Sequence, residues 1–244
     1  MIAWRKASWD NLKRNFLWPS VASLLVGLAL FLWRIRDFFP LLGFTLSAFV
    51  VFTILFDTAF VVRVRKRIAG EGIVAALVTL ARHNQRRYGG LVVHLGIVLI
   101  VLGIAGSMSY SVEREATLQV KEGLPIGRYY IQFEGLKGSQ QPTHYRVEAA
   151  FRLFNEGHDL GVFGPALKFF PSQQSPVGRA VFRSTLKEDL YLILSGFSEL
   201  QENRATLKVL VRPMVVWIWL GGFVIALGTV ICISPLGKLS RVDA

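Results

Sequence analysis

Three apolar stretches of membrane-spanning length constrain this chain more than any other feature. They cover residues 38–62, 88–110 and 213–235. A bilayer core requires about 20 consecutive, mostly apolar residues per helix. A fourth stretch, residues 16–33, is marginal in length but contains only apolar or small residues. We therefore predict an α-helical polytopic membrane protein with four transmembrane helices.

The segment between the last two stretches, residues 111–212, has a different periodicity. Apolar and polar residues alternate in runs such as 129–133 and 190–194, and clusters of Gly, Pro, Ser and Asn separate the runs. This pattern is typical of β-strands and predicts seven or eight of them. We expect an inserted all-β extracytoplasmic domain, either a sandwich or a small barrel. Within it, residues 155–157 should form a hairpin turn and residues 135–142 a loop.

The net charge of +12 follows the expected membrane topology. Basic residues precede the first helix, gather between the second and third, and follow the fourth: Arg5, Lys6, Lys13, Arg14; Arg63, Arg65, Lys66, Arg67, Arg82, Arg86, Arg87; Lys238, Arg241. All three segments fall on one side of a four-helix topology, as the positive-inside rule requires of the cytoplasmic face. We expect both termini, including the tail 236–244, to be cytoplasmic. The near-neutral domain 111–212 then faces outward, and no basic module for nucleic acid remains.

Residues 73–84 separate the second and third helices. Their apolar side chains recur at helical spacing, with Thr79, Arg82 and His83 on the other side. The pattern predicts either an amphipathic helix at the cytoplasmic interface or a simple linker helix.

The chain contains no recognisable catalytic motif of its own. Its single cysteine, Cys232 in the last helix, can form neither a disulfide framework nor a thiolate metal site. We find no nucleophile triad, phosphate-binding glycine loop or paired carboxylates. We assign no catalytic residue, and any catalysis must depend on a cofactor or a partner.

His94 is the most informative single residue. It lies six residues inside the third helix, about 9 Å from its cytoplasmic end, in a segment otherwise free of strongly charged side chains. An ionisable group at that depth is costly and marks a functional site by default. His94 is either an axial ligand of haem iron or a histidine that hydrogen-bonds a neighbouring helix.

Glycines define the faces of the same helix. Gly89, Gly96 and Gly103 recur every seven residues and predict a stripe for close helix packing. His94 points about 160° away from Gly96. Gly90, one turn before His94, would leave room beside the imidazole for a flat ligand.

Other polar or aromatic residues have simpler explanations. Asp57 either belongs to a proton or ion path or meets the Arg63–Arg67 cluster near the interface. His144 and His158 in the outer domain are expected to be surface histidines. Trp217 and Trp219 form either part of the aromatic belt of a membrane interface or an outward-facing aromatic shelf for a cofactor.

Several strings in the chain resemble one family, the C-terminal part of CcmF proteins of bacterial cytochrome c maturation (system I). They are Arg86-Arg-Tyr-Gly-Gly-Leu-Val-Val-His94-Leu-Gly96 with Gly106-Ser, Asp189-Leu-Tyr191, Pro213…Trp217-Ile-Trp-Leu-Gly-Gly222, and Trp4-Arg5. The resemblance implies that His94 is one of two transmembrane ligands of haem b. It also implies a place in the bacterial inner membrane, with the β domain in the periplasm.

The family acts as a haem lyase: with partner subunits it receives haem from a chaperone and attaches it to apocytochrome c. Its b-type haem is thought to keep the transferred haem iron reduced. The family's tryptophan-rich WGxxWxWD segment, its two outward histidines and the other transmembrane ligand are not in this sequence. The chain is therefore expected to be either a naturally split subunit or a truncated reading frame, inactive alone and dependent on an upstream half that carries WGxxWxWD.

Two rival functions follow from the same architecture. A permease-like or mechanotransmitting subunit would couple to a cytoplasmic ATPase through residues 73–84. A ligand sensor would need a cytoplasmic signalling module, and only nine residues follow Pro235 in this sequence.

Overall fold

The computed structural model describes residues 9–70, 72–198 and 202–234. The chain divides into two compact units, one formed by Met1–Ser109 with Met214–Ala244 and the other by Tyr110–Pro213. The terminal residues Arg5, Lys6, Lys238 and Arg241 and the expected tail 236–244 lie outside the described residues.

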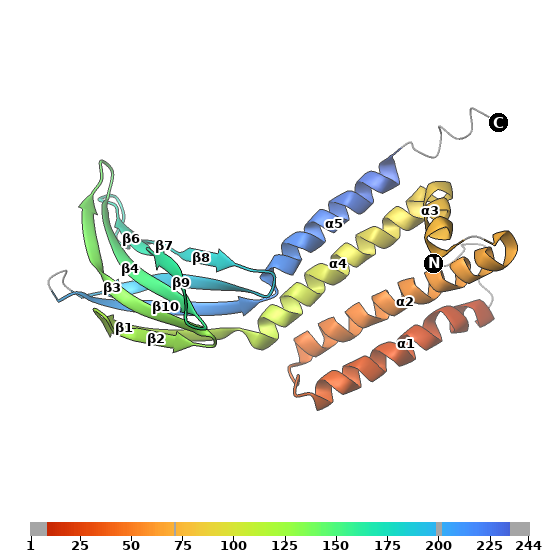
Figure 1. Ribbon diagram of the computed structural model, residues 1–244, viewed down its shortest axis with the longest axis horizontal. Helices are drawn as coiled ribbons and strands as arrows, with labels where there is room; N and C mark the ends of the chain where they lie inside the picture. Colours follow the sequence, from red (N-terminus) through yellow and green to blue (C-terminus); the bar gives the residue numbers. More distant parts are fainter. Residues whose placement is uncertain (1–8, 71, 199–201, 235–244) are drawn as a thin grey trace. The chain divides into compact units, whose positions relative to one another are not determined.

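The first unit is helical. Its elements are α1 (Trp9–Leu32), α2 (Phe38–Ala69), α3 (Ile73–His83), α4 (Gln85–Tyr110) and α5 (Val215–Ile233) (Figure 1). Helices α2, α4 and α5 are long and apolar enough to cross a membrane. The apolar part of α1, Phe16–Leu32, is shorter, so the first of the four expected spans stays a prediction. The protein is a multi-pass membrane protein.

Two helices extend beyond their apolar stretches into charged sequence. Helix α2 continues past Val62 to Ala69, because Arg and Lys are good helix formers. It ends at Gly70, whose left-handed backbone (φ 64°) lets its N–H donate to the Lys66 carbonyl. Helix α4 starts at Gln85, three residues before the expected boundary.

The second unit is a sandwich of two antiparallel sheets. Its strands are β1 (Val112–Gln119), β2 (Gly123–Ile126), β3 (Tyr129–Gln140), β4 (Tyr145–Asn155), β5 (His158–Phe163), β6 (Ala166–Phe169), β7 (Val177–Arg179), β8 (Val181–Ser184), β9 (Glu188–Phe197) and β10 (Arg204–Pro213). One sheet has the order β1-β10-β9-β8; the other has the order β2-β3-β4-β6-β7, with β5 paired to β4. The expected membrane protein with an inserted all-β domain is confirmed, and its architecture is the sandwich.

The strand boundaries correct two expectations. The described residues form ten strands, not seven or eight. The loop expected over 135–142 is wrong: strand β3 runs through to Gln140, because a bulge at Gly135 (φ 150°) re-registers it against β4. The hairpin turn is confirmed, since Glu156 and Gly157 both have positive φ between the paired residues Asn155 and His158.

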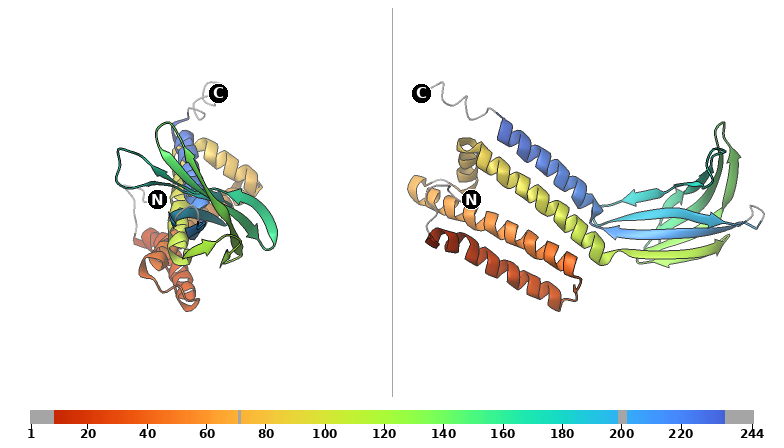
Figure 2. Two further views of the ribbon diagram at one scale, coloured as in Figure 1. Left: turned by 90° about the vertical axis from the view of Figure 1, so that its left-hand side faces the viewer. Right: turned by 180° about the vertical axis from the view of Figure 1, so that it is seen from behind.

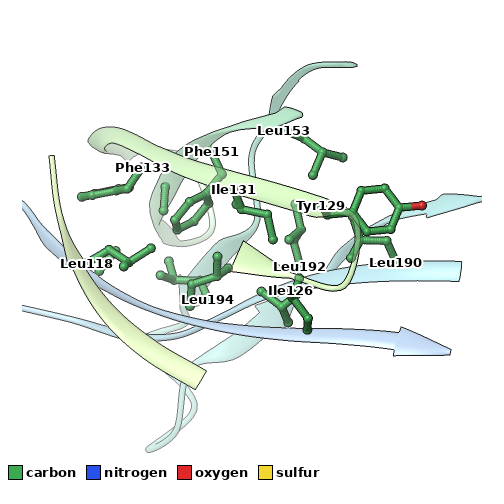
Figure 3. Close-up of a cluster of buried hydrophobic side chains, with 14 of the residues drawn as sticks. Leu118, Ile126, Tyr129, Ile131, Phe133, Phe151, Leu153, Leu190, Leu192 and Leu194 are labelled. Carbon is green, nitrogen blue, oxygen red and sulfur yellow. The ribbon is translucent and has the colours of Figure 1, made fainter. Parts of the chain in front are cut away.

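The two sheets enclose a dry core (Figure 3). Phe133 and Phe151 are fully buried, with ring centroids 5.2 Å apart, on neighbouring strands of one sheet. Leu192 and Leu207 face them from the other sheet. Along β4 buried residues alternate with half-exposed ones, which is the period that identified the strands from sequence.

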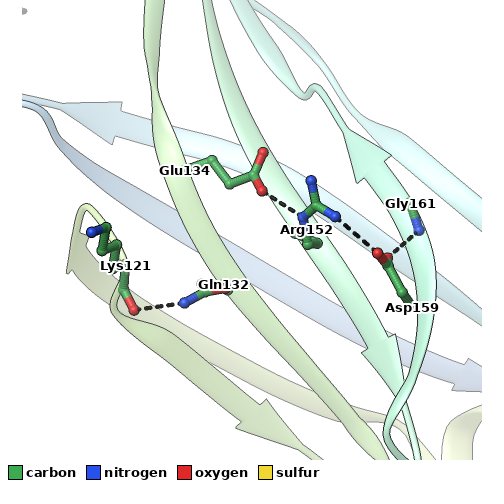
Figure 4. Close-up of polar contacts among 6 residues, drawn as sticks. All are labelled: Lys121, Gln132, Glu134, Arg152, Asp159 and Gly161. Carbon is green, nitrogen blue, oxygen red and sulfur yellow. Dashed lines mark hydrogen bonds and ion pairs between the residues drawn. The ribbon is translucent and has the colours of Figure 1, made fainter.

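The outward side of the same strands carries ion pairs. The Arg152 guanidinium binds Glu134 at 2.5 Å and Asp159 at 2.9 Å (Figure 4). The Gly161 N–H donates to Asp159, and this bond, with Arg152, holds the pKa of that carboxyl below its usual range.

Candidate functional site

Helices α4 and α5 pack side by side through glycines (Figure 2). A Cβ on Gly96 would lie 2.7 Å from the Gly221 carbonyl oxygen and 2.8 Å from the Ile225 nitrogen. Gly89 approaches Gly228 as closely, and Gly103 approaches Met214. Real Cβ atoms essentially never come within 3.0 Å of backbone, so Gly89 and Gly96 require glycine, while a Cβ on Gly103 would be crowded at 3.0 Å from the Met214 carbonyl oxygen. The predicted packing stripe on α4 therefore contacts α5.

His94 lies on a different face of α4 and is exposed. Its Nδ1 is 2.7 Å from the carbonyl oxygen of Gly90, one turn earlier. A carbonyl only accepts, so the hydrogen of this bond belongs to Nδ1. In the neutral ring the lone pair is then on Nε2. His94 thus forms its hydrogen bond within its own helix and does not use it to hold a neighbouring one.

Gly90 leaves space beside the imidazole. A Cβ built on this glycine would have nothing within 4 Å outside its own helix backbone, in contrast to the neighbouring Gly89. The structure therefore has room here for the edge of a planar group.

Contacts between α2 and α4 mark the two ends of the His94 face. Arg87 and Val101 lie seven residues before and after His94, within about 20° of it around the helix. The Arg87 guanidinium donates to both oxygens of Asp57 on α2, at 2.8 and 2.6 Å. At the other end, a Cβ on Gly43 of α2 would lie 3.4 Å from the Val101 side chain. His94 lies on α4 between these two contacts.

This arrangement fits an axial haem ligand. Histidines that bind metals commonly donate their other ring N–H to a backbone carbonyl, which fixes the tautomer and the ring orientation. His94 has this partner, an Nε2 with a lone pair, and open space at Gly90. These residues would hold the iron from one side.

Asp57 has a partner that sequence analysis did not identify. We expected the Arg63–Arg67 cluster, but its carboxylate binds Arg87. The two residues are 30 positions apart, and their pairing follows from the antiparallel contact of α2 and α4. The seven-residue spacing of Arg87 and His94 places both on one face of α4 but does not identify Asp57 as the partner of Arg87.

The histidines of the second unit and the tryptophans are spread over the fold. His144 is half-buried and stacks on Phe170 with ring centroids 4.9 Å apart. His158 is exposed beside the Glu156–Gly157 turn. Trp219 is 77% exposed on α5. Within the described ranges no group of three or more His, Cys, Asp or Glu side chains could hold a metal ion.

A family model for the CcmF C-terminal β-sandwich matches residues 109–213, which include the whole second unit. The cytochrome c-type biogenesis protein CcmF of Haemophilus influenzae is 30% identical over 149 residues, covering 61% of this chain and 23% of that protein. CcmF of Escherichia coli is 27% identical over 179 residues, covering 72% and 27%.

Two further comparisons extend over nearly the whole chain. The cytochrome c-type biogenesis protein CycK of Bradyrhizobium diazoefficiens is 23% identical over 235 residues, covering 96% of this chain and 35% of that protein. A solved structure titled cytochrome c heme lyase CcmF superposes with a TM-score of 0.65 at 25% identity, covering 95% of this chain and 36% of that one.

The fold and the helical packing define a class: multi-pass membrane proteins with a β-sandwich inserted before the last helix. Within that class, residues 109–213 match the CcmF C-terminal β-sandwich family, and the chain as a whole is similar to the C-terminal part of CcmF cytochrome c-type biogenesis proteins. It spans roughly a quarter of the length of the first two relatives named above.

Proposed function

We propose that this protein is a component of the cytochrome c maturation haem lyase and provides His94 as one of two axial ligands of a transmembrane haem b. The second ligand and the WGxxWxWD segment would come from the upstream part of the family. In this proposal the sandwich lies in the periplasm, where it helps to position the haem chaperone and apocytochrome c. The chain does not attach haem by itself.

The hydrogen bond from His94 Nδ1 to the Gly90 carbonyl is the observation that carries the proposal. It orients the imidazole within its own helix and assigns the hydrogen to Nδ1, so that in the neutral ring Nε2 is the nitrogen with the lone pair. A histidine that contributes to helix packing would instead use its ring nitrogens to hydrogen-bond another helix. The related proteins are named cytochrome c-type biogenesis protein and heme lyase, and these names indicate that the ligand proposed for His94 is haem.

A bound b-type haem supplies one-electron transfer and so a means of keeping the iron of the transferred haem reduced. The chain's own residues hold the ligand in place. The Gly90 carbonyl fixes the His94 tautomer, and the glycine contacts with α5 keep α4 positioned from its other side. The Asp57–Arg87 ion pair links α4 to α2 at a position seven residues before His94.

The proposed orientation places the sandwich in the periplasm and both termini in the cytoplasm of a bacterium, at the inner membrane. Its support is the distribution of charge: Arg63, Arg65, Lys66 and Arg67 extend α2 at the end remote from the sandwich insertion.

Replacing His94 with Ala in the reconstituted complex tests the ligand. We expect the reduced b-type absorption to be lost while the protein still assembles, because no side chain remains to bind the iron from α4. His144→Ala is the matched control, since His144 stacks on Phe170 in the other unit, and it should keep the signal. An unchanged b-type spectrum in His94→Ala would refute the proposed ligand.

A further inference from the structure

The β-sandwich has a cavity of about 390 Å³ that the haem proposal does not use. Its apolar base includes Ile126, Tyr129 and Val211, which are at most 8% exposed. Its charged rim consists of Arg128, Lys187 and Glu188. The cavity also touches Tyr110 and Pro213, the residues through which the chain enters and leaves the sandwich.

The length of α5 places the start of that helix, and the adjoining Pro213, relative to the bilayer. Helix α5 has 19 residues, about 28 Å at 1.5 Å per residue, and the hydrocarbon core is about 30 Å thick. The helix needs its whole length to cross, so its first residue, Val215, lies at the edge of the core. Pro213, two residues earlier, then lies in the headgroup layer.

Strand pairing brings the cavity rim close to Pro213. Glu188 is the antiparallel partner of Pro213, and paired residues are about 5 Å apart. Leu186 and Lys187 form the turn that precedes Glu188, between β8 and β9. Leu186 is 71% exposed and Lys187 is exposed, a combination suited to a lipid–water boundary.

The charges at the rim favour an anion. Arg128 donates from its Nε and one terminal nitrogen to a single Glu188 oxygen, at 2.8 and 2.6 Å. The guanidinium has five N–H donors in all. With Lys187, the three rim side chains carry a net charge of +1, and Glu188 keeps Arg128 oriented at the mouth of the cavity.

We propose that this cavity binds the phosphate-containing headgroup of an anionic membrane phospholipid. Arg128 and Lys187 contact the phosphate, while Ile126, Tyr129 and Val211 contact the apolar part next to it. Leu186 enters the interface beside it. The lipid thereby attaches the membrane-proximal end of the sandwich to the bilayer surface, independently of haem binding.

Native mass spectrometry of the full chain, in detergent supplemented with phosphatidylglycerol or phosphatidylcholine, tests lipid binding. We expect wild type to retain phosphatidylglycerol in preference, and Lys187→Gln to bind it about fivefold more weakly, since a basic residue at an anionic surface contributes about that factor. Arg128→Gln should act in the same direction. Lys137→Gln is the matched control, because Lys137 is exposed eight residues along β3 from Tyr129, and it should bind as wild type.

A second readout remains valid if Arg128→Gln fails to fold. A nitroxide at Leu186→Cys in a Cys232→Ser background, in phosphatidylglycerol nanodiscs, should be accessible to oxygen and shielded from a water-soluble relaxant. The same label at Gln140→Cys, at the far end of β3, should show the reverse. A water-exposed label at 186, equal lipid binding by Lys187→Gln and wild type, or displacement of the lipid by excess inorganic phosphate would each overturn the proposal.

Discussion

At the scale of single residues, the backbone carbonyl of Gly90 decides the chemistry available to His94. It accepts a hydrogen bond from Nδ1, with the two atoms 2.7 Å apart, and leaves Nε2 of the neutral ring as the nitrogen that would bind iron in the proposed site. The same glycine has no side chain, and a Cβ built on it would have nothing within 4 Å. Gly90 therefore fixes the tautomer of neutral His94 through its carbonyl group and leaves open space because it has no side chain.

Filling that space should abolish haem binding without loosening the helices. Gly90→Leu is expected to lose the reduced b-type spectrum in the complex, because its side chain would occupy the open region beside His94. Gly222→Leu is the matched control, since a Cβ there also has nothing within 4 Å but lies on α5. Equal haem content in the two purified variants would count against a site at Gly90.

Tyr129 makes the stability of the sandwich depend on pH in the alkaline range. Burial, followed by its hydrogen bond with Glu188, raises the pKa of Tyr129 above the usual value. A raised folded-state pKa means a contribution to stability that is fully present below about pH 10 and lost as the pH rises through the folded value. The difference in melting temperature between wild type and Tyr129→Phe should therefore shrink above pH 10. A difference that stays constant with pH would contradict this assignment.

At the scale of secondary-structure elements, α4 and α5 form one block, because glycines of both helices let their backbones approach closely. Gly221 faces Gly96, and Gly228 faces Gly89, so each helix supplies glycine where the other comes closest. This block holds α4 from one side, while His94 lies on another face of α4, between the Arg87 and Val101 contacts with α2.

Adding one methyl group at that contact should destabilise the block. Gly96→Ala places a Cβ within 2.8 Å of α5 backbone atoms, and overpacking of this kind costs about 1–3 kcal/mol. The melting temperature in detergent should fall by several degrees, while Gly90→Ala should leave it unchanged. Equal melting temperatures would show that α4 and α5 do not pack as described.

Sequence periodicity was sufficient to predict which helices and strands form, but not the residues at which they begin and end. Alternation identified β4 because one face is buried in the core, and apolar length identified α2, α4 and α5. The extension of β3 to Gln140 was missed, since a glycine that makes a bulge looks the same in sequence as one that ends a strand.

The site was predictable only in part for a related reason. His94 and Gly90 are four residues apart, so helix geometry alone relates them. The pairing of Asp57 with Arg87, and the cavity rim formed by Arg128 and Glu188, join residues 30 and 60 positions apart. Only the folded chain brings such residues together.

At the scale of the whole molecule, the protein covers 36% of the solved heme lyase with which it superposes. In our account it provides one side of a haem site and depends on the upstream part of the family for the other. Its proposed contribution is a haem ligand on a helix that packs closely against α5, together with the β-sandwich.

The most direct test of the central claim, that His94 binds haem iron, is chemical rescue. In the reconstituted complex, His94→Gly should lack the reduced b-type absorption, and added imidazole should restore it, because the open space at Gly90 admits the free ligand. Rescue would separate loss of the ligand from loss of the fold. A full b-type spectrum in His94→Gly before imidazole is added would contradict the account.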